Sequence, residues 1–223
     1  CCMKYFILLI LAAFTFHCNA QLKFAPISLK EKEYVLFTDS LEKKYSHKKK
    51  TTSDCHLQAL IALSYYPELE NTKIKFKHKK IKSTAQARPT ILSSLRNKKK
   101  RNYLIILNKN ENHDAPLYSE FTFNAKVGLI GHELAHISKF RETGFFKLIS
   151  EGIKYRKKEF KSAFEKDTDK RTIEHGLGWQ IYDFSSQLQA KPDVPDSYKE
   201  YKQKMYFTSH QIYDLMQELG YEM

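Results

Sequence analysis

VGLIGHELAHI, residues 127–137, is the most informative segment of this 223-residue chain. Apolar residues recur within it at the three- and four-residue spacing of a helix face. Gly131 and Ala135 are small enough to let a neighbouring element or a substrate approach closely. The sequence therefore predicts a buried helix over residues 123–140, with one apolar side formed by Val127, Ile130, Leu134 and Ile137.

His132 and His136 carry the chemistry expected of this helix. Because they are four residues apart, their imidazoles project from one face, and both can bind one Zn²⁺ ion. Glu133 is rotated by about 100° from His132, which places it beside the ion as a general base. The ion would lower the pKa of a bound water toward ~7 and polarise a peptide carbonyl. HExxH patterns also arise by chance, but burying three such side chains without a partner is costly.

A third protein ligand must lie elsewhere, because a catalytic zinc site uses three side chains and keeps one position open. The extended metzincin pattern would need glycine at position 139 and histidine at position 142, where this chain has lysine and glutamate. We therefore expect an acidic ligand downstream. The candidates are Glu151, Glu159, Glu165 and Glu174, with His175 in addition.

Glu165 and Asp169 stand out among these acids because they are four residues apart on a helix predicted over residues 160–175. One carboxylate can bind the metal while the other orients a zinc-binding histidine through its second ring nitrogen. The alternative is an ordinary solvated face, since lysines and acids are mixed in this segment.

HELAH followed by Glu-x-x-x-Asp resembles the gluzincin metallopeptidases, particularly the family of CAAX prenyl proteases and bacterial heat-shock proteases, over about residues 70–175. The resemblance implies a zincin-like fold, with Glu165 as the third zinc ligand and Asp169 supporting the site. His175 is a further candidate for a supporting role. A peptidase also needs a donor for the oxyanion, and Tyr155 or His175 could supply it.

The resemblance has limits that the sequence itself sets. In thermolysin-like and aminopeptidase-like gluzincins the ligand glutamate would fall near Tyr155 and Arg156, so those subfamilies do not fit. Prenyl proteases cross the membrane several times, whereas this chain has no hydrophobic span after its N-terminal segment. Prenyl substrates are therefore not carried over, and the chain is more similar to small exported relatives.

Two segments predict strands, and the other segments are mostly helical. Residues 73–77 (KIKFK) alternate between charged and apolar, as expected of a half-buried strand at a sheet edge. Asn102–Asn108 (NYLIILN) is a short apolar strand before the zinc helix, where the resemblance places the edge strand that binds substrate. The order of elements predicts an α+β fold, zincin-like and mostly helical, with a small sheet.

The N-terminus predicts export. We take Met3 as the start, preceded by two extra residues. Lys4 and the apolar run over residues 5–16 are typical of a signal peptide ending at Ala20. An uncleaved anchor or lipidation at Cys18 are the alternatives. The protein is then periplasmic or secreted, with a single domain over residues 21–223 whose only cysteine, Cys55, is expected to pack in the core.

The formal net charge is +13, and much of it lies in short lysine runs at residues 48–50, 73–82 and 98–101. Such runs favour either an anionic partner, such as an envelope surface, or ordinary solvated loops. Export disfavours a nucleic-acid partner.

The leading hypothesis is a zinc-dependent endopeptidase that acts on extended polypeptides. The alternatives are a catalytically silent zinc-binding scaffold and a basic envelope-binding protein.

Overall fold

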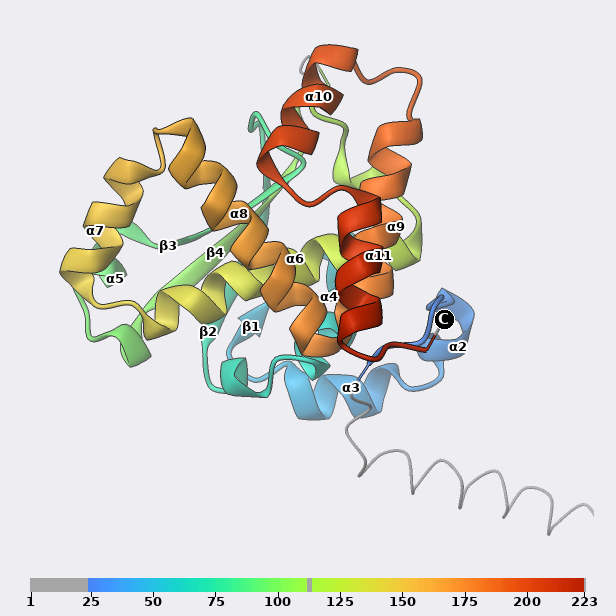
Figure 1. Ribbon diagram of the computed structural model, residues 1–223. Coiled ribbons are helices and arrows are strands. Elements are labelled where there is room, and N and C mark those ends of the chain that lie inside the picture. The colour runs from blue at the N-terminus through green and yellow to red at the C-terminus, as the bar shows by residue number, and fades with distance from the viewer. Residues whose placement is uncertain (1–23, 112–113, 223) are drawn as a thin grey trace, which may run out of the picture.

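The computed structural model describes residues 24–111 and 114–222 and has an α+β fold, mostly helical with a small sheet (Figure 1). The signal-peptide prediction for residues 1–20 lies outside the described residues. The helices are α2 (Glu31–Val35), α3 (Thr38–Tyr45), α4 (His56–Ser64), α5 (Ile91–Ser94), α6 (Phe123–Glu142), α7 (Phe145–Lys154), α8 (Lys158–Thr172), α9 (Gly178–Ala190), α10 (Asp196–Met205) and α11 (Ser209–Glu218). Short 3₁₀ turns are η1 (Ser53–Cys55), η2 (Pro67–Leu69), η3 (Lys98–Lys100) and η4 (Tyr118–Glu120), and η5 (Ile173–Leu177) is a π turn.

The sheet has four strands in the order β1-β2-β4-β3. The strands are β1 (Lys49–Lys50), β2 (Lys73–Lys79), β3 (Ala85–Pro89) and β4 (Asn102–Asn108). β1, β2 and β4 are parallel, and β3 pairs antiparallel with β4. β2 is a strand as predicted, but it is not an edge strand, because β1 pairs with its start on one side and β4 pairs along its length on the other.

The prediction that Asn102–Asn108 is the edge strand is wrong. β4 lies between β2 and β3, and six of its seven residues are buried. A continuous apolar run is the pattern of a strand covered on both faces, which is what β4 is. The strand at the open edge is β3, which the sequence analysis did not predict.

α6 is the central helix of the fold, and the predicted buried helix is confirmed. It contacts β3 as well as α4, α8 and α9. Thr122 caps its start by accepting a hydrogen bond from the Ala125 amide. Gly128 faces α9 so closely that a Cβ there would overlap the Gln180 backbone. Glycine at this position therefore lets two central helices touch through their backbones.

The second predicted helix, over residues 160–175, corresponds to α8 and the π turn that continues it. Leu41 and Tyr45 of α3 pack against the core. The capping box of Thr208 and Gln211 opens α11. Cys55 is fully buried, as predicted.

The connection between α8 and α9 positions the elements around the site. Gly176 has a φ of 95°, a left-handed conformation that glycine adopts without strain. This residue turns the chain from α8 into α9, and both helices then pack against α6. In the part of the chain that the structure describes, no helix combines the length and apolar character needed to cross a membrane.

Candidate metal centre

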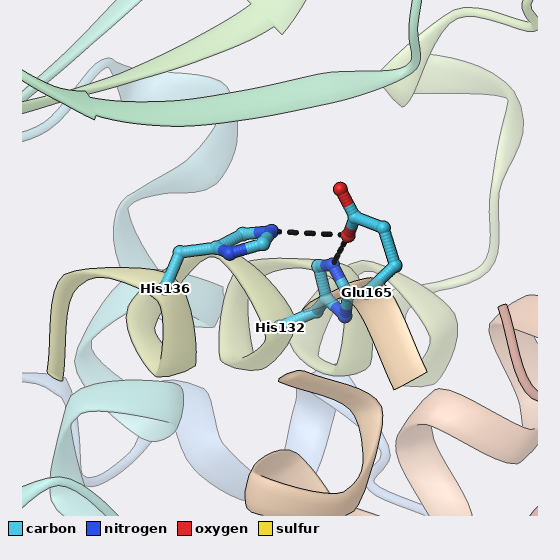
Figure 2. A group of neighbouring side chains, drawn as sticks. All are labelled: His132, His136 and Glu165. Carbon is cyan, nitrogen blue, oxygen red and sulfur yellow. Dashed lines mark hydrogen bonds and ion pairs between the residues drawn. The ribbon is translucent and has the colours of Figure 1, made fainter. Parts of the chain in front are cut away.

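Three side chains from two helices meet at one point beside α6. α6 carries His132 and His136 one turn apart, and α8 supplies Glu165 from the side (Figure 2). The Oε2 atom of Glu165 lies 3.2 Å from His132 Nε2 and 3.3 Å from His136 Nε2. We call these three residues the metal cluster.

The metal cluster fits a metal ion in both chemistry and spacing. Two imidazole nitrogens and one carboxylate oxygen form a common catalytic zinc donor set. Ligand atoms about 2.0–2.1 Å from a tetrahedral ion would lie about 3.3–3.4 Å from one another, close to the separations found here. The three donor atoms lie within 4.8 Å of one another and all three residues are buried. This group can therefore bind a metal ion.

The second ring nitrogens of both histidines face side-chain oxygens, His132 in an ion-pair contact and His136 in a hydrogen bond. His132 Nδ1 lies 2.8 Å from Asp169 Oδ1, and His136 Nδ1 lies 3.2 Å from Thr168 Oγ1. The other oxygen of Asp169 accepts a hydrogen bond from the Phe207 amide. Because these contacts hold each ring through Nδ1, both Nε2 atoms stay turned toward Glu165.

The charges within this group oppose the cost of burial. Burial alone would raise the pKa of Glu165, but the two histidines outweigh it and hold the pKa well below its usual range. Burial would likewise lower the pKa of His132, but Asp169 and Glu165 raise it to about 10. Without a metal ion, these contacts favour the ionised carboxylate and the protonated imidazole, so metal binding would release a proton.

Tyr155 lies against the metal cluster, although not as the free oxyanion donor that the sequence analysis considered. Its hydroxyl donates a hydrogen bond to Glu165 Oε1. One oxygen of Glu165 is therefore held by Tyr155, and the other faces the two histidines.

Glu133 lies beside the metal cluster and retains an unused acceptor. The residue is 4% exposed, and among the described residues its Oε2 atom has no hydrogen-bond partner. Burial raises the pKa of its carboxyl, although His136 and His132 act in the opposite direction. Other buried side-chain atoms of the described residues also lack a partner, among them Glu151 Oε2. What distinguishes the Glu133 oxygen is its place beside the metal cluster, where it is able to accept a hydrogen bond from a bound molecule.

A pocket opens next to Glu133 and brings in two residues that the sequence analysis missed, Lys202 and Tyr206. Both line this pocket together with His132 and Glu133. The Lys202 ammonium lies 3.4 Å from the centre of the Tyr206 ring, and burial lowers the pKa of Lys202 to about 8. No signal in the sequence singles out one lysine among so many. The apolar part of the lining is Ala85, Leu129, Ile181, Phe184, Leu188, Phe207 and Ile212.

The structure does not bring His175 to the metal cluster. Its Nδ1 donates to the carbonyl oxygen of Arg171, and its Nε2 lies 3.2 Å from Glu68 Oε1. The same Glu68 oxygen accepts a hydrogen bond from Ser138. His175 sits in the π turn that ends at Leu177, so its side chain takes a different direction from those of α8. We call Glu68, Ser138 and His175 the Glu68 cluster.

The other acids proposed as ligands also lie elsewhere. Glu174 is exposed and pairs with Lys170 on its own helix. Glu159 is exposed, and Glu151 lies 3.9 Å from Lys147. Of the sequence candidates, the structure therefore places only Glu165 within reach of both histidines of α6.

Known proteins offer no assignment for this chain. No protein-family model, characterised protein or solved structure matches it. The candidate site therefore rests on its own residues and their geometry.

Proposed function

We propose that this protein is a zinc-dependent endopeptidase with a zincin-like fold, similar to the gluzincins. One observation carries the proposal: three buried donor atoms converge beside a buried carboxylate, Glu133, whose oxygen has no partner in the described part of the chain. A structural ion site would need no such carboxylate, whereas hydrolysis needs a group that takes up a proton.

His132, His136 and Glu165 would hold the metal, and zinc suits a set of two nitrogens and one oxygen. When bound, Zn²⁺ polarises the carbonyl of a peptide bond and makes a coordinated water more acidic. Asp169 and Thr168 keep the two imidazole rings oriented for this role. Tyr155 fixes the glutamate ligand by donating to its outer oxygen.

Glu133 is the proposed general base. Its unpartnered Oε2 atom accepts the proton of the attacking water and passes it to the leaving amine. The raised pKa of this carboxyl suits the role, because the carboxyl can hold the proton taken from water until it is passed to the amine. Lys202 and Tyr206 line the same pocket and supply donors for the negative charge that develops on the carbonyl oxygen.

An extended polypeptide is the substrate that the sheet favours. β3 pairs with β4 on one side only, and Thr84 and Ala85, at its start, line the pocket beside Glu133. The Thr84 carbonyl accepts a hydrogen bond from the Asn108 amide, and the Thr90 amide donates to the Asn102 carbonyl. Because the backbone N–H and C=O groups of successive residues point to alternate sides of a strand, those of Ala87 point away from β4. A substrate strand could add to this edge through the N–H and C=O groups of Ala87. The apolar lining of the pocket would then accept an apolar side chain of the substrate.

We place this activity in the cell envelope or outside the cell, because residues 1–20 have the pattern of a signal peptide.

Metal content and hydrolysis test the proposal together. We expect about one zinc ion per chain by mass spectrometry, and much less in Glu165→Ala. Glu174→Ala is the matched control, since it removes an exposed acid from the end of the same helical segment and should keep the zinc. An unfolded fluorescent polypeptide should be cleaved by the zinc-loaded parent, should resist cleavage after chelation, and should be cleaved again when zinc returns.

Three outcomes would overturn parts of the proposal. A parent that binds no zinc, even after reconstitution, would leave a basic envelope-binding protein as the better description. Zinc without hydrolysis of any unfolded substrate would indicate a silent zinc-binding scaffold. Full zinc content in Glu165→Ala would remove Glu165 from the ligand set.

A further inference from the structure

α7 presents an unusual apolar surface for a helix of a folded domain. None of its residues is buried, and Phe146, Ile149 and Ile153 are exposed at the spacing of one helix face. Phe146 is 85% exposed, although it is among the largest apolar side chains. Lys147 and Lys154 flank this face and are also exposed. An amphipathic helix whose apolar face is largely exposed is typical of an interaction surface.

A second exposed apolar group lies at the same end of the molecule (Figure 1). Ile91 and Leu92 of α5, together with Leu95, are each more than 70% exposed. The segment that follows α5 is tied to the end of α6, because Arg101 donates to the Thr143 carbonyl at 2.8 Å. α7 starts two residues after Thr143. We call these six residues the apolar patch: Ile91, Leu92, Leu95, Phe146, Ile149 and Ile153.

A basic pocket adjoins the apolar patch. It lies at the start of the parallel strands, and no acidic residue lines it. Its lining includes Lys49 and Arg101, whose side chains donate to backbone carbonyl oxygens. The other five cations are exposed, and none forms an ion pair within the described residues. We call these five the basic cluster: Lys48, Lys50, Lys73, Lys99 and Lys100.

η3 joins the two features physically. Lys99 and Lys100 belong to η3, and the exposed Leu95 lies only a few residues before it. Lys98 of the same turn donates to the Glu142 carbonyl at 3.2 Å, at the end of α6 that leads into α7. One end of the protein therefore combines large exposed apolar side chains with unpaired lysines.

From this combination we infer that the end of the molecule formed by α5, α7, η3 and the starts of β1 and β2 docks on an anionic lipid membrane. The apolar patch enters the boundary between headgroups and acyl chains, and the basic cluster binds lipid phosphates. A nucleic acid would satisfy the lysines and leave the apolar patch in water. An apolar peptide would do the reverse. The inference concerns a surface outside the metal cluster and does not depend on peptidase activity.

Vesicle co-sedimentation of the full chain tests this inference. The parent should bind phosphatidylglycerol vesicles more tightly than phosphatidylcholine vesicles, and the difference should shrink in high salt. Replacing the five lysines of the basic cluster by glutamine should weaken binding to anionic vesicles at least tenfold. The matched control replaces five exposed lysines elsewhere, and it should bind more tightly than the cluster variant: Lys30, Lys32, Lys43, Lys170 and Lys204. Both variants lose the same charge.

The apolar patch has its own pair of variants. Phe146→Asp with Ile153→Asp should weaken binding to anionic vesicles at least tenfold, whereas Val35→Asp with Leu36→Asp, also exposed, should have little effect. All of these chains share the same N-terminal segment, so its contribution cancels. Equal losses in the two lysine variants would reduce the effect to net charge and overturn the inference. Slower cleavage of a soluble peptide by the apolar variant, without vesicles and without a loss of vesicle binding, would assign the patch to substrate instead.

Discussion

Two histidine–carboxylate clusters lie along α6, and they differ in what they leave unpaired. In the Glu68 cluster both ring nitrogens of His175 and the Ser138 hydroxyl have neighbours, and Glu68 is partly exposed to solvent: His175 contacts Glu68 and the Arg171 carbonyl, and Ser138 donates to Glu68. In the metal cluster the donor atoms of two histidines converge on Glu165, next to the unpartnered oxygen of Glu133. A histidine beside a carboxylate is therefore not enough to indicate chemistry. The unused donor and acceptor capacity distinguishes a candidate site from a structural network.

The largest expected effect is on hydrolysis, and it comes from replacing Glu133 beside the metal cluster. Glu68 of the Glu68 cluster provides the comparison. Glu133→Gln should lower hydrolysis by about 10²–10⁴-fold while zinc content stays near that of the parent, because only the proton acceptor is lost. Glu68→Gln keeps an acceptor for Ser138 and should leave hydrolysis within about threefold. Steady-state cleavage of a peptide and metal analysis measure both. Similar activity losses in the two variants would break the distinction between the clusters.

Zinc affinity should depend on the residues that support the metal cluster. Asp169→Asn removes the charge next to His132 Nδ1 and should weaken zinc binding by about 10–100-fold in a competition titration with a chelator. Asp167→Asn is the control two residues away, where the side chain is half exposed and contacts Lys139. An unchanged affinity in Asp169→Asn would show that Asp169 does not orient the ligand.

A smaller effect is expected from the sheet edge that lies on the metal-cluster side of α6. Ala87→Pro removes one outward N–H, and kcat/KM for an extended peptide should fall by roughly three- to tenfold. Because Ala87 is also buried in the core, the proline ring should lower the melting temperature somewhat, and kcat/KM is therefore measured well below the melting temperature of the variant. Gln86→Ala, a change in an exposed side chain of the same strand, should leave kcat/KM unchanged. Full activity in Ala87→Pro would argue against strand addition at β3.

The smallest effect concerns stability and belongs to the Glu68 cluster alone. Burial lowers the pKa of His175, but Glu68 and the Arg171 carbonyl raise it above its ordinary value of 6.5. Burial raises the pKa of Glu68, but His175 and Ser138 bring it below 4.5. The histidine stabilises the fold below pH 6.5 and loses this effect as pH rises through its folded pKa. The glutamate stabilises above pH 4.5 and loses this effect as pH falls, so the pair contributes most between these values.

His175→Gln should therefore lower the free energy of unfolding by about 1 kcal/mol near pH 5.5, and by less near pH 8. The figure is kept small because Glu68 is partly exposed and solvent screens the pair. Denaturant unfolding of the metal-free parent and variant at both pH values measures it, since bound metal would stabilise the folded state. A larger difference near pH 8 would contradict the assignment of charges.

The metal cluster was more predictable from sequence than its surroundings. The four-residue spacing of His132 and His136 places them on one face of any helix, so the helical pattern alone predicted their proximity. Glu165 was one acid among several, and the spacing to Asp169 together with the family resemblance selected it. These relations are local in sequence, which is why pattern and spacing could indicate them.

The parts that were missed depend on long-range packing. β3 contains two alanines and a proline, which have little strand preference of their own, and its pairing with β4 makes it a strand. Lys202 and Tyr206 reach the pocket only because α10 folds back toward α8. His175 was considered for the site, but the turn at Gly176 carries it to Glu68 instead. The periodicity of the sequence could not predict these contacts, because they depend on how distant segments pack.

The hydrogen bond between Asp169 and the Phe207 amide has a consequence for synthesis. Phe207 lies 38 residues after Asp169, so a chain made from its N-terminus contains every proposed metal ligand before it contains this contact. The support of His132 is completed only after Phe207 has been joined, so the proposed peptidase would gain this contact after all of its metal ligands have already been made.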